Sequence, residues 1–141
     1  MRLYIYKAAA VRVPRRRLQQ LFDRITSSER GGKGGVNIIF TGDRELHRLN
    51  KQYRRIDKTT DVLSFNLDDE AGEGEVFGEI YISVATAERQ AREYGTGLAD
   101  ELLRLSCHGL LHLFGYDHHR RDEAAEMRRR EEKYLAVAEG R

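Results

Sequence analysis

The sequence is poor in several residues that would otherwise shape a fold, with no tryptophan, one cysteine and one proline among 141 residues. A single cysteine excludes an internal disulfide and agrees with a reducing compartment. No apolar run approaches the roughly 18 residues that a membrane-spanning helix needs. The N-terminal segment lacks the anatomy of a signal peptide, so we expect a cytoplasmic protein.

The net charge is only +2, but it is unevenly distributed along the chain. Residues 1–58 hold fifteen Lys and Arg against five Asp and Glu, a net charge of +10, whereas residues 59–141 have a net charge of −8. Arginine provides 20 of the 25 basic residues, and its planar guanidinium group suits phosphate. The asymmetry points to nucleic acid, and solvated, arginine-rich helix faces are the alternative interpretation.

Hydrophobic patterns predict one α+β domain that spans residues 1–141, with a small mixed four-stranded sheet packed with about five helices. The predicted strands lie at residues 3–6, 36–40, 63–67 and 76–84, the last two as an antiparallel pair joined by an acidic loop at 68–75. The predicted helices cover residues 14–25, 43–53, 83–95, 98–114 and 122–138.

Two of these helices have a predicted cap or a predicted buried face. Thr41 or Asp43 is expected to cap the second helix, and Tyr53 is expected to face inward from it. Residues 98–114 are apolar nearly all round, which is typical of a helix buried in the middle of a domain.

The end of this buried helix carries histidines in the spacing H-x-x-x-H-x-x-G-x-x-H. His108 and His112 are four residues apart, so both lie on one helix face with Cβ atoms about 6 Å apart. Gly115 is well placed to end the helix in a left-handed turn, after which the chain can return His118 to the same point. Three imidazoles leave one tetrahedral position open for water, as in catalytic zinc sites. We therefore predict a metal ion, with zinc as the expected one, held by three histidines and a water.

Several neighbours of the histidines have two interpretations each. Asp117 can accept the second ring N–H of a ligand histidine, or it can simply shape the turn. Glu101, two helical turns before His108, has either a supporting or ion-pairing role or is a surface charge. His119 is expected at the rim or in solvent, and Cys107 is expected to be a buried, inert thiol.

The residue after the first histidine is Gly109, where zinc proteases with this spacing carry their catalytic Glu. Cleavage of a phosphodiester does not require a base there, because a metal can polarise the phosphoryl oxygen and lower the pKa of its water to about 7. An arginine would stabilise charge on the phosphate, and the basic half of the chain would hold the polyanion. Two alternatives remain, a metal-dependent hydrolase of another bond, metalloprotease-like, and a non-catalytic RNA-binding protein with a structural metal, which the family resemblance described next would make a ribosome assembly factor.

Two motifs of the sequence resemble the YbeY family of bacterial single-strand-specific endoribonucleases. One is the histidine frame, H-G-x-L-H-L-x-G-Y-D-H at residues 108–118, and the other is Leu-Asn…Tyr-Arg…Asp-Lys…Thr-Asp-Val-Leu-Ser-Phe at residues 49–65. The resemblance covers residues 36 to 135, and residues 78–80 and the C-terminal helix around Met127 agree more loosely. The sequence departs from the family at Thr59 and Asn66, where Pro is common, and at Glu79, where Asp is usual.

This resemblance implies a function and a set of site residues. The three histidines of the frame match the ligands of the family's metal, usually taken to be zinc, and Arg54 matches an arginine important for activity. The implied fold is a small mixed sheet with helices and a metal in a cleft. The implied role is 3′-end maturation of small-subunit ribosomal RNA and ribosome quality control, with single-stranded ribosomal RNA and ribosome or small-subunit assembly proteins as partners. The general base is open, with Asp117 and Asp61 as candidates.

Overall fold

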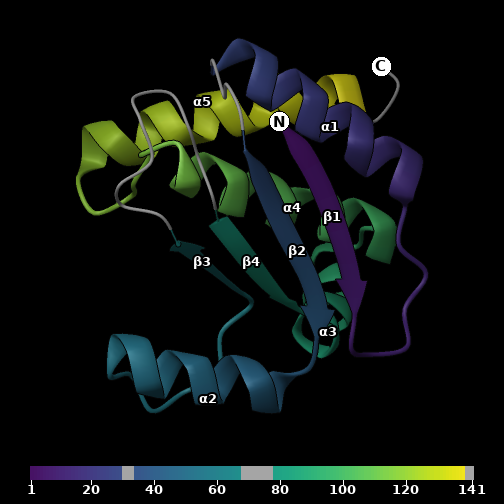
Figure 1. The fold of residues 1–141 in the computed structure, drawn as a ribbon, viewed down its shortest axis with the longest axis vertical. Helices are drawn as coiled ribbons and strands as arrows, with labels where there is room; N and C mark the ends of the chain where they lie inside the picture. Colours follow the sequence, from purple (N-terminus) through teal and green to yellow (C-terminus); the bar gives the residue numbers. More distant parts are fainter. Residues whose placement is uncertain (30–33, 68–77, 139–141) are drawn as a thin grey trace.

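The computed structural model describes residues 1–29, 34–67 and 78–138, and the predicted acidic loop at 68–75 lies outside them. Its elements are β1 (Arg2–Lys7), α1 (Arg15–Ser28), β2 (Gly35–Thr41), α2 (Asp43–Arg54), β3 (Val62–Asn66), β4 (Gly78–Ser83), α3 (Val84–Tyr94), α4 (Leu98–Leu113) and α5 (Arg121–Ala138). This architecture confirms the prediction of an α+β fold (Figure 1). No helix in the described ranges is long and apolar enough to cross a membrane.

The four strands form one mixed sheet in the order β1-β2-β4-β3. Strands β1, β2 and β4 run parallel to one another, and β3 is antiparallel to β4. This confirms the prediction that the last two strands form an antiparallel pair. Ile5, Ile38 and Ile80 are register partners across three strands. Because side chains alternate along a strand, this row places apolar residues on the same face of the sheet, where they form the core.

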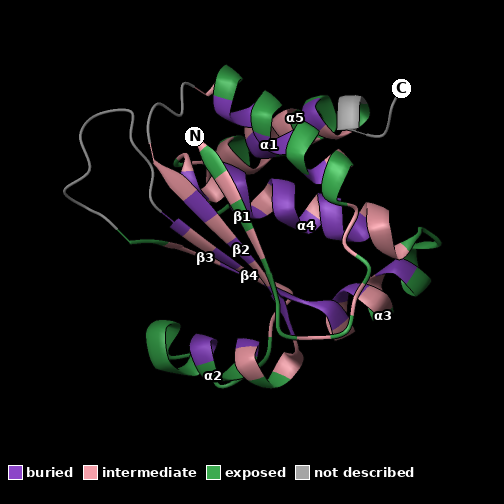
Figure 2. Ribbon diagram, turned by 45° about the vertical axis from the view of Figure 1, so that its right-hand side comes forward, coloured by how far each residue is buried: buried purple, intermediate pink, exposed green. Residues whose placement is uncertain are grey.

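The two faces of the sheet are covered differently. Helices α1, α4 and α5 pack on the face that carries the main core, and α2 lies on the opposite side against β3 and β4 (Figures 1 and 2). Beneath α2 is a second, smaller cluster formed by Leu46, Leu49 and Leu63. Helix α2 is therefore attached to the sheet by a small apolar contact, whereas α4 is buried between the sheet and three other helices.

Helix α1 packs on the core through an apolar stripe with helical spacing, whose four members are buried: Leu18, Leu21, Phe22 and Ile25. Ser83 caps α3, since its Oγ accepts a hydrogen bond from the backbone N–H of Thr86 at 3.2 Å, and Gly95 ends α3 with a φ of +69°. In α5, Met127 and Tyr134 are buried and hold the helix against the core.

The predictions for the second helix need correction. Gly42, rather than Thr41 or Asp43, occupies the cap position of α2, and it has no side chain to bond the first turn. Tyr53 is 61% exposed and does not face the core. The buried residues of α2 end at Asn50, so Tyr53 lies beyond the buried face of the helix. Its ring makes an edge-type contact with the ring of Phe65, with centroids 5.4 Å apart.

Candidate metal centre and cleft

The metal-site segment begins with the end of α4. After Phe114, the chain enters the left-handed region at Gly115, whose φ is +93°. The backbone N–H of Gly115 donates to the carbonyl of His112, and that of Tyr116 donates to the carbonyl of Leu111, each at 3.0 Å. These two bonds form a Schellman motif, which satisfies carbonyls at the helix end and reverses the chain. The predicted turn is confirmed, and it carries residues 117–119 back toward α4.

The turn brings the three histidines of the frame together. The ring centroids of His108 and His112 are 4.7 Å apart, and His118 lies 5.6 Å from the first and 5.2 Å from the second. One ring nitrogen from each histidine lies within 4.8 Å of the other two. The three side chains are thus positioned to bind a metal ion, and the group has three members among the residues that the structure describes.

The protonation state of the cluster favours a metal. Burial of His112, together with the neighbouring His108 and His118, lowers the pKa of the His112 imidazole to about 4. This side chain is therefore neutral at pH 7, and a neutral imidazole has the lone pair that a metal ion requires.

The histidines form one wall of a cleft with a volume of about 730 Å³. The opposite wall comes from the end of α2, from the segment that follows it and from β3, and includes Arg54, Lys58, Asp61 and Ser64. A cleft of this size falls in the usual range of small-ligand sites, about 300–1,000 Å³. The two sequence motifs, which are separated by more than forty residues, therefore face each other across one space.

Arg54 is the last residue of α2 and lies in the cleft wall. Its Nη2 donates to the carbonyl oxygen of Ser64 at 3.3 Å, and its guanidinium carbon lies 6.0 Å from the ring centroid of Phe65. Arg55 then adopts a left-handed conformation, with a φ of 58°, which ends the helix. The arginine is exposed, and one weak bond leaves most of its donors available for a ligand.

The structure places the carboxylate of Asp117 against the backbone of the turn and not against a ring N–H of His118. Its Oδ1 accepts a hydrogen bond from the backbone N–H of His118 at 2.7 Å and lies 4.0 Å from Nδ1 of that histidine, too far for a hydrogen bond. The backbone bond lowers the pKa of the Asp117 carboxyl. Asp117 therefore shapes the turn, because an aspartate readily binds the N–H of a following residue.

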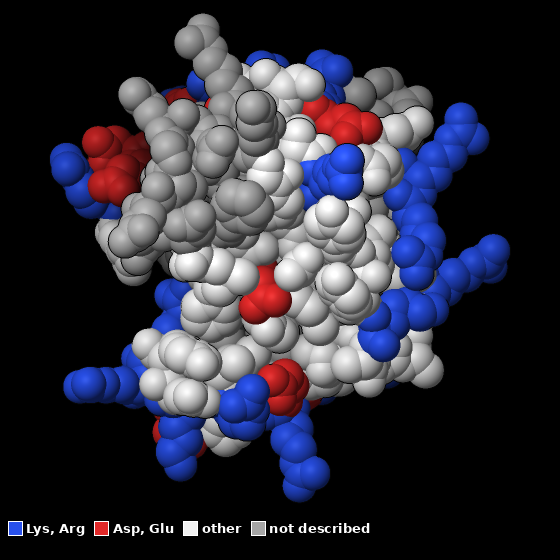
Figure 3. All heavy atoms as spheres, in the orientation of Figure 1, with Lys and Arg blue, Asp and Glu red and all other residues white. Residues whose placement is uncertain are grey.

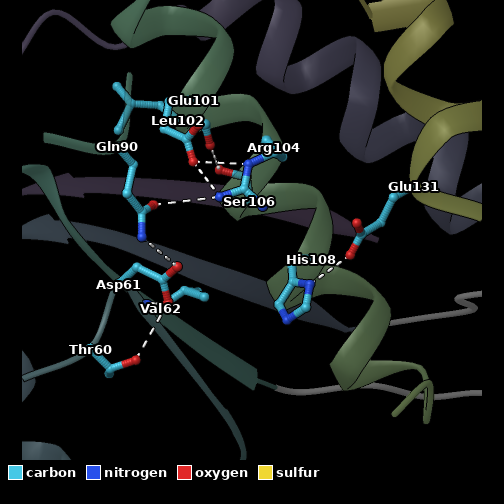
Figure 4. A network of polar contacts seen from close by, with 10 residues as sticks. All are labelled: Thr60, Asp61, Val62, Gln90, Glu101, Leu102, Arg104, Ser106, His108 and Glu131. Carbon is cyan, nitrogen blue, oxygen red and sulfur yellow. Dashed lines mark hydrogen bonds and ion pairs between the residues drawn. The ribbon is translucent and has the colours of Figure 1, made fainter. Parts of the chain in front are cut away.

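The sequence analysis missed a carboxylate that does reach a ring nitrogen of the cluster. Oε1 of Glu131, in α5, lies 2.6 Å from Nδ1 of His108 (Figure 4). The two residues are 23 positions apart, so no local spacing connects them. A signal existed nevertheless, because Glu131 lies four residues after Met127 and three before Tyr134, on the inward stripe of α5.

A network of polar contacts beside the cleft fixes Asp61 (Figure 4). Its Oδ1 accepts from the backbone N–H of Val62 at 2.8 Å, and its Oδ2 accepts from the Gln90 amide at 3.2 Å. Gln90 in turn contacts Arg104, which forms an ion pair with Glu101. Glu101 is only 2% exposed, so its interpretation as a surface charge is wrong and its ion-pairing role is confirmed.

The two other neighbours of the frame lie as expected. Cys107 is fully buried, and burial raises the pKa of its thiol far above the usual value, which makes it unreactive. The side chain of His119 is 80% exposed and lies at the rim of the cleft, with Nε2 3.3 Å from Oδ1 of Asp117.

Gly109 explains why this frame lacks the protease base. A Cβ atom at Gly109 would lie 2.7 Å from Cγ2 of Ile80 and 3.0 Å from Oγ of Ser64. The Ser64 hydroxyl also donates to the Gly109 carbonyl at 3.0 Å, which links β3 to α4. This position thus packs directly against the sheet, and the close approach of helix and sheet has no room for a glutamate.

The chain is an α+β domain whose central helix ends in a turn, and the helix and turn together bring three histidines to the wall of a cleft. This arrangement is typical of a metal-binding domain. Comparison with known proteins identifies it further. The family model described as "Endoribonuclease YbeY" matches residues 5–139, and the chain belongs to this family.

Individual relatives agree with this membership. An endoribonuclease YbeY of Heliobacterium modesticaldum is 49% identical over 111 residues, covering 71% of this chain and 67% of the relative. One from Carboxydothermus hydrogenoformans is 42% identical over 113 residues, covering 80% and 78%. The solution structure of TM1509 from Thermotoga maritima superimposes with a TM-score of 0.64 at 31% identity, over 98% of this chain and 89% of that one.

The three departures from the family pattern lie at different distances from the cleft. Thr59 and Asn66 both line it, Thr59 between α2 and β3 and Asn66 at the end of β3. Glu79 is near the start of β4, where it accepts hydrogen bonds from Asn37 and Tyr81. Two of the three positions therefore line the α2 side of the cleft, and none of them is on the histidine wall.

Proposed function

We propose that this chain is a zinc-dependent, single-strand-specific endoribonuclease that acts in the 3′-end maturation of small-subunit ribosomal RNA and in ribosome quality control. Membership in a family of endoribonucleases supports hydrolysis of RNA phosphodiester bonds as its activity. The whole chain, residues 1–141, forms the catalytic domain in this proposal. Its partners are then the ribosome or small-subunit assembly proteins, which implies a cytoplasmic location.

The observation that carries the proposal is the joint placement of three histidines and Arg54 in one cleft. A zinc ion at the histidines would polarise a phosphoryl oxygen and lower the pKa of a bound water to about 7. His108, His112 and His118 fit such an ion because they offer three converging nitrogen ligands at the wall of a cleft. Arg54 would bind the scissile phosphate and stabilise the negative charge that develops on it, since a guanidinium group matches phosphate geometry.

The charge distribution supports a polyanionic substrate. Helix α2 exposes four basic side chains, those of Arg44, Arg48, Lys51 and Arg54. Figure 3 shows Lys and Arg side chains projecting from the end of the molecule that α2 forms. These groups would hold the RNA backbone near the cleft through phosphate contacts that weaken as the salt concentration rises.

The geometry disfavours the two alternatives. Peptide hydrolysis by the protease mechanism would need a base at position 109, where a side chain would collide with Ile80 and Ser64. A structural zinc is normally enclosed by four protein ligands, whereas the group found within the described ranges has three and borders a cleft. Both features favour a reactive, open site.

The proposal can be tested with purified protein whose metal content is measured. We expect cleavage of a labelled single-stranded fragment from the 3′ end of small-subunit ribosomal RNA, loss of cleavage after chelation, and recovery when zinc is restored. The same fragment annealed to its complement is the matched control and should stay intact. If metal-loaded protein leaves the single strand intact, and chelation unfolds the domain, the structural-metal alternative is correct.

A further inference from the structure

Glu131 connects α5 to the histidine cluster on α4. Its carboxylate lies 2.6 Å from His108 Nδ1, and the two side chains are only 17% and 25% exposed. The other inward residues of α5, Met127 and Tyr134, make apolar contacts with the core. A charged group on this stripe is costly to bury unless it has a partner, and the partner here is a histidine of the candidate metal site.

The same pairing occurs elsewhere in the molecule without these surroundings. His47 Nε2 lies 2.6 Å from Oδ1 of Asp57, but these side chains are 46% and 71% exposed. His47 is not part of the histidine cluster. A short distance alone therefore does not indicate a function, and what distinguishes Glu131 is that its partner belongs to a converging group and that water is largely excluded from the pair.

The orientation of His108 determines what the bond does. Its Nε2 is 3.1 Å from Nε2 of His112, so Nε2 faces the cluster and Nδ1 faces Glu131. A carboxylate that accepts a hydrogen bond from Nδ1–H fixes the tautomer in which Nε2 has its lone pair free. The same bond makes Nε2 a stronger metal ligand.

We propose that Glu131 is a positioning residue of the metal centre, and that metal binding at the histidines stabilises the docking of α5. The inference rests on the proposed metal site. If the docking of α5 raises the affinity of the histidines for the ion by some factor, then binding of the ion raises the equilibrium constant for docking of α5 by the same factor. This follows because coupling between two equilibria is reciprocal. Helix α5 is thus a part of the metal centre that the histidine spacing does not reveal.

The first test measures metal affinity in Glu131→Gln, with Glu132→Gln as the matched control. Glu132 is exposed on the same helix, so the control removes the same charge from it. Titration of apoprotein with zinc against a chromophoric chelator should give an affinity about 10–100-fold weaker for Glu131→Gln, the usual effect of losing a carboxylate behind a ligand histidine. The control should stay within about two-fold of the wild type, since it leaves the histidine bond intact.

The second test measures amide hydrogen exchange with and without zinc. In the wild type, zinc should slow exchange in α4, in residues 114–119 and also in α5. In Glu131→Gln the slowing should be confined to α4 and residues 114–119. Because glutamine is nearly the same size as glutamate, the wild-type and Glu131→Gln apoproteins should have similar melting temperatures.

Glu131→Asp provides a second variant, because it keeps the charge but shortens its reach. Its zinc affinity should lie between that of the wild type and that of Glu131→Gln.

The outcomes separate this inference from the proposed function. Tight zinc binding by both the wild type and Glu131→Gln would overturn the positioning role while leaving the metal site standing. Exchange in wild-type α5 that does not respond to zinc would overturn the coupling to docking. A wild-type protein that binds no zinc would overturn both the inference and the metal-dependent function on which it rests.

Discussion

The two walls of the cleft are built in different ways. The histidine wall comes from one short segment, α4 and the turn after it, and α4 is held by tight packing that includes the contact of Gly109 with the sheet. The opposite wall rests on the small apolar cluster beneath α2 and on polar contacts of the segment after it. Asn50 Nδ2 donates to the carbonyl of Lys58 at 3.0 Å, and Arg54 donates to that of Ser64. Residues 51–59 are all exposed.

This difference indicates a division of labour between the walls. A metal site needs ligands held within a few tenths of an ångström, which a buried helix and a closed turn provide. A phosphate-binding wall must accept a flexible chain, and exposed arginine and lysine side chains can adapt to it. If so, changes on the histidine wall should abolish metal binding and activity together, whereas changes on the α2 wall should affect activity alone.

The largest effect is expected from His112→Ala on the histidine wall. Removing the middle ligand should abolish tight zinc binding and reduce cleavage by about 1000-fold or more, because a metal contributes several kcal/mol to the stabilisation of the transition state. Zinc content after dialysis and single-turnover cleavage rates would measure both. His47→Ala, which removes an exposed histidine outside the cluster, is the control. Retained zinc in His112→Ala would mean that this histidine is not a ligand.

Arg54→Ala should separate the two walls. We expect the variant to keep its zinc but to cleave RNA about 100-fold more slowly, in the range seen when one donor to a developing charge is removed. Lys51→Ala removes an exposed positive charge from the same helix and should reduce the rate only slightly at moderate salt. Zinc content and cleavage rates would be measured in both variants. An unchanged rate in Arg54→Ala would remove this residue from the mechanism.

Gly109→Ala tests whether packing holds the histidine wall. An alanine gains about 1 kcal/mol of helix propensity over glycine, but its Cβ would overlap Ile80, and overpacking of this kind costs about 1–3 kcal/mol. We expect a net loss of about 1 kcal/mol in the free energy of unfolding, measured by urea denaturation of the apoprotein. A more stable variant would show that the helix and sheet can move apart easily.

The histidine wall was predictable from the sequence because its information is local. Helical spacing and a glycine at the helix end specify how three side chains meet, and the turn has the predicted conformation. The α2 wall was predicted only through family resemblance, because Arg54 reaches the cleft through the packing of α2 on β3 and β4. The fold class followed from alternating and helical hydrophobic patterns, which depend on burial in the same local way.

The features that the sequence analysis missed depend on tertiary contacts. Glu131 and His108 meet because α5 packs across α4, and Glu101 is buried because other helices cover α4, although its ion-pair partner Arg104 is only three residues away. Tyr53 was predicted to face the core because the spacing of apolar residues on a helix does not show where the contact between α2 and the sheet ends. In each case, the sequence shows a residue's type and face, and what covers that face comes from an element elsewhere in the chain.

A change in stability is also expected where α2 is anchored to the rest of the fold. Asp43, the first residue of α2, accepts hydrogen bonds from Ser83 at 2.5 Å, Thr86 at 2.6 Å and Arg89 at 2.8 Å. Burial acts to raise the pKa of the Asp43 carboxyl, but the three hydrogen bonds and the charge of Arg89 outweigh it and lower the pKa below the ordinary 3.8. The stability from this carboxylate is thus present above pH 3.8 and is lost as the pH falls through the lowered value.

Asp43→Asn should therefore destabilise the protein by about 1–2 kcal/mol at pH 7, in the range for hydrogen bonds to a charged group. The difference from the wild type should narrow as the pH falls below 3.8, where the wild-type carboxyl also becomes neutral. Urea denaturation of both proteins across this range would measure it, with Asp23→Asn, at an exposed position of α1, as the control. A difference independent of pH would mean that packing, and not the charge of Asp43, holds the α2 wall in place.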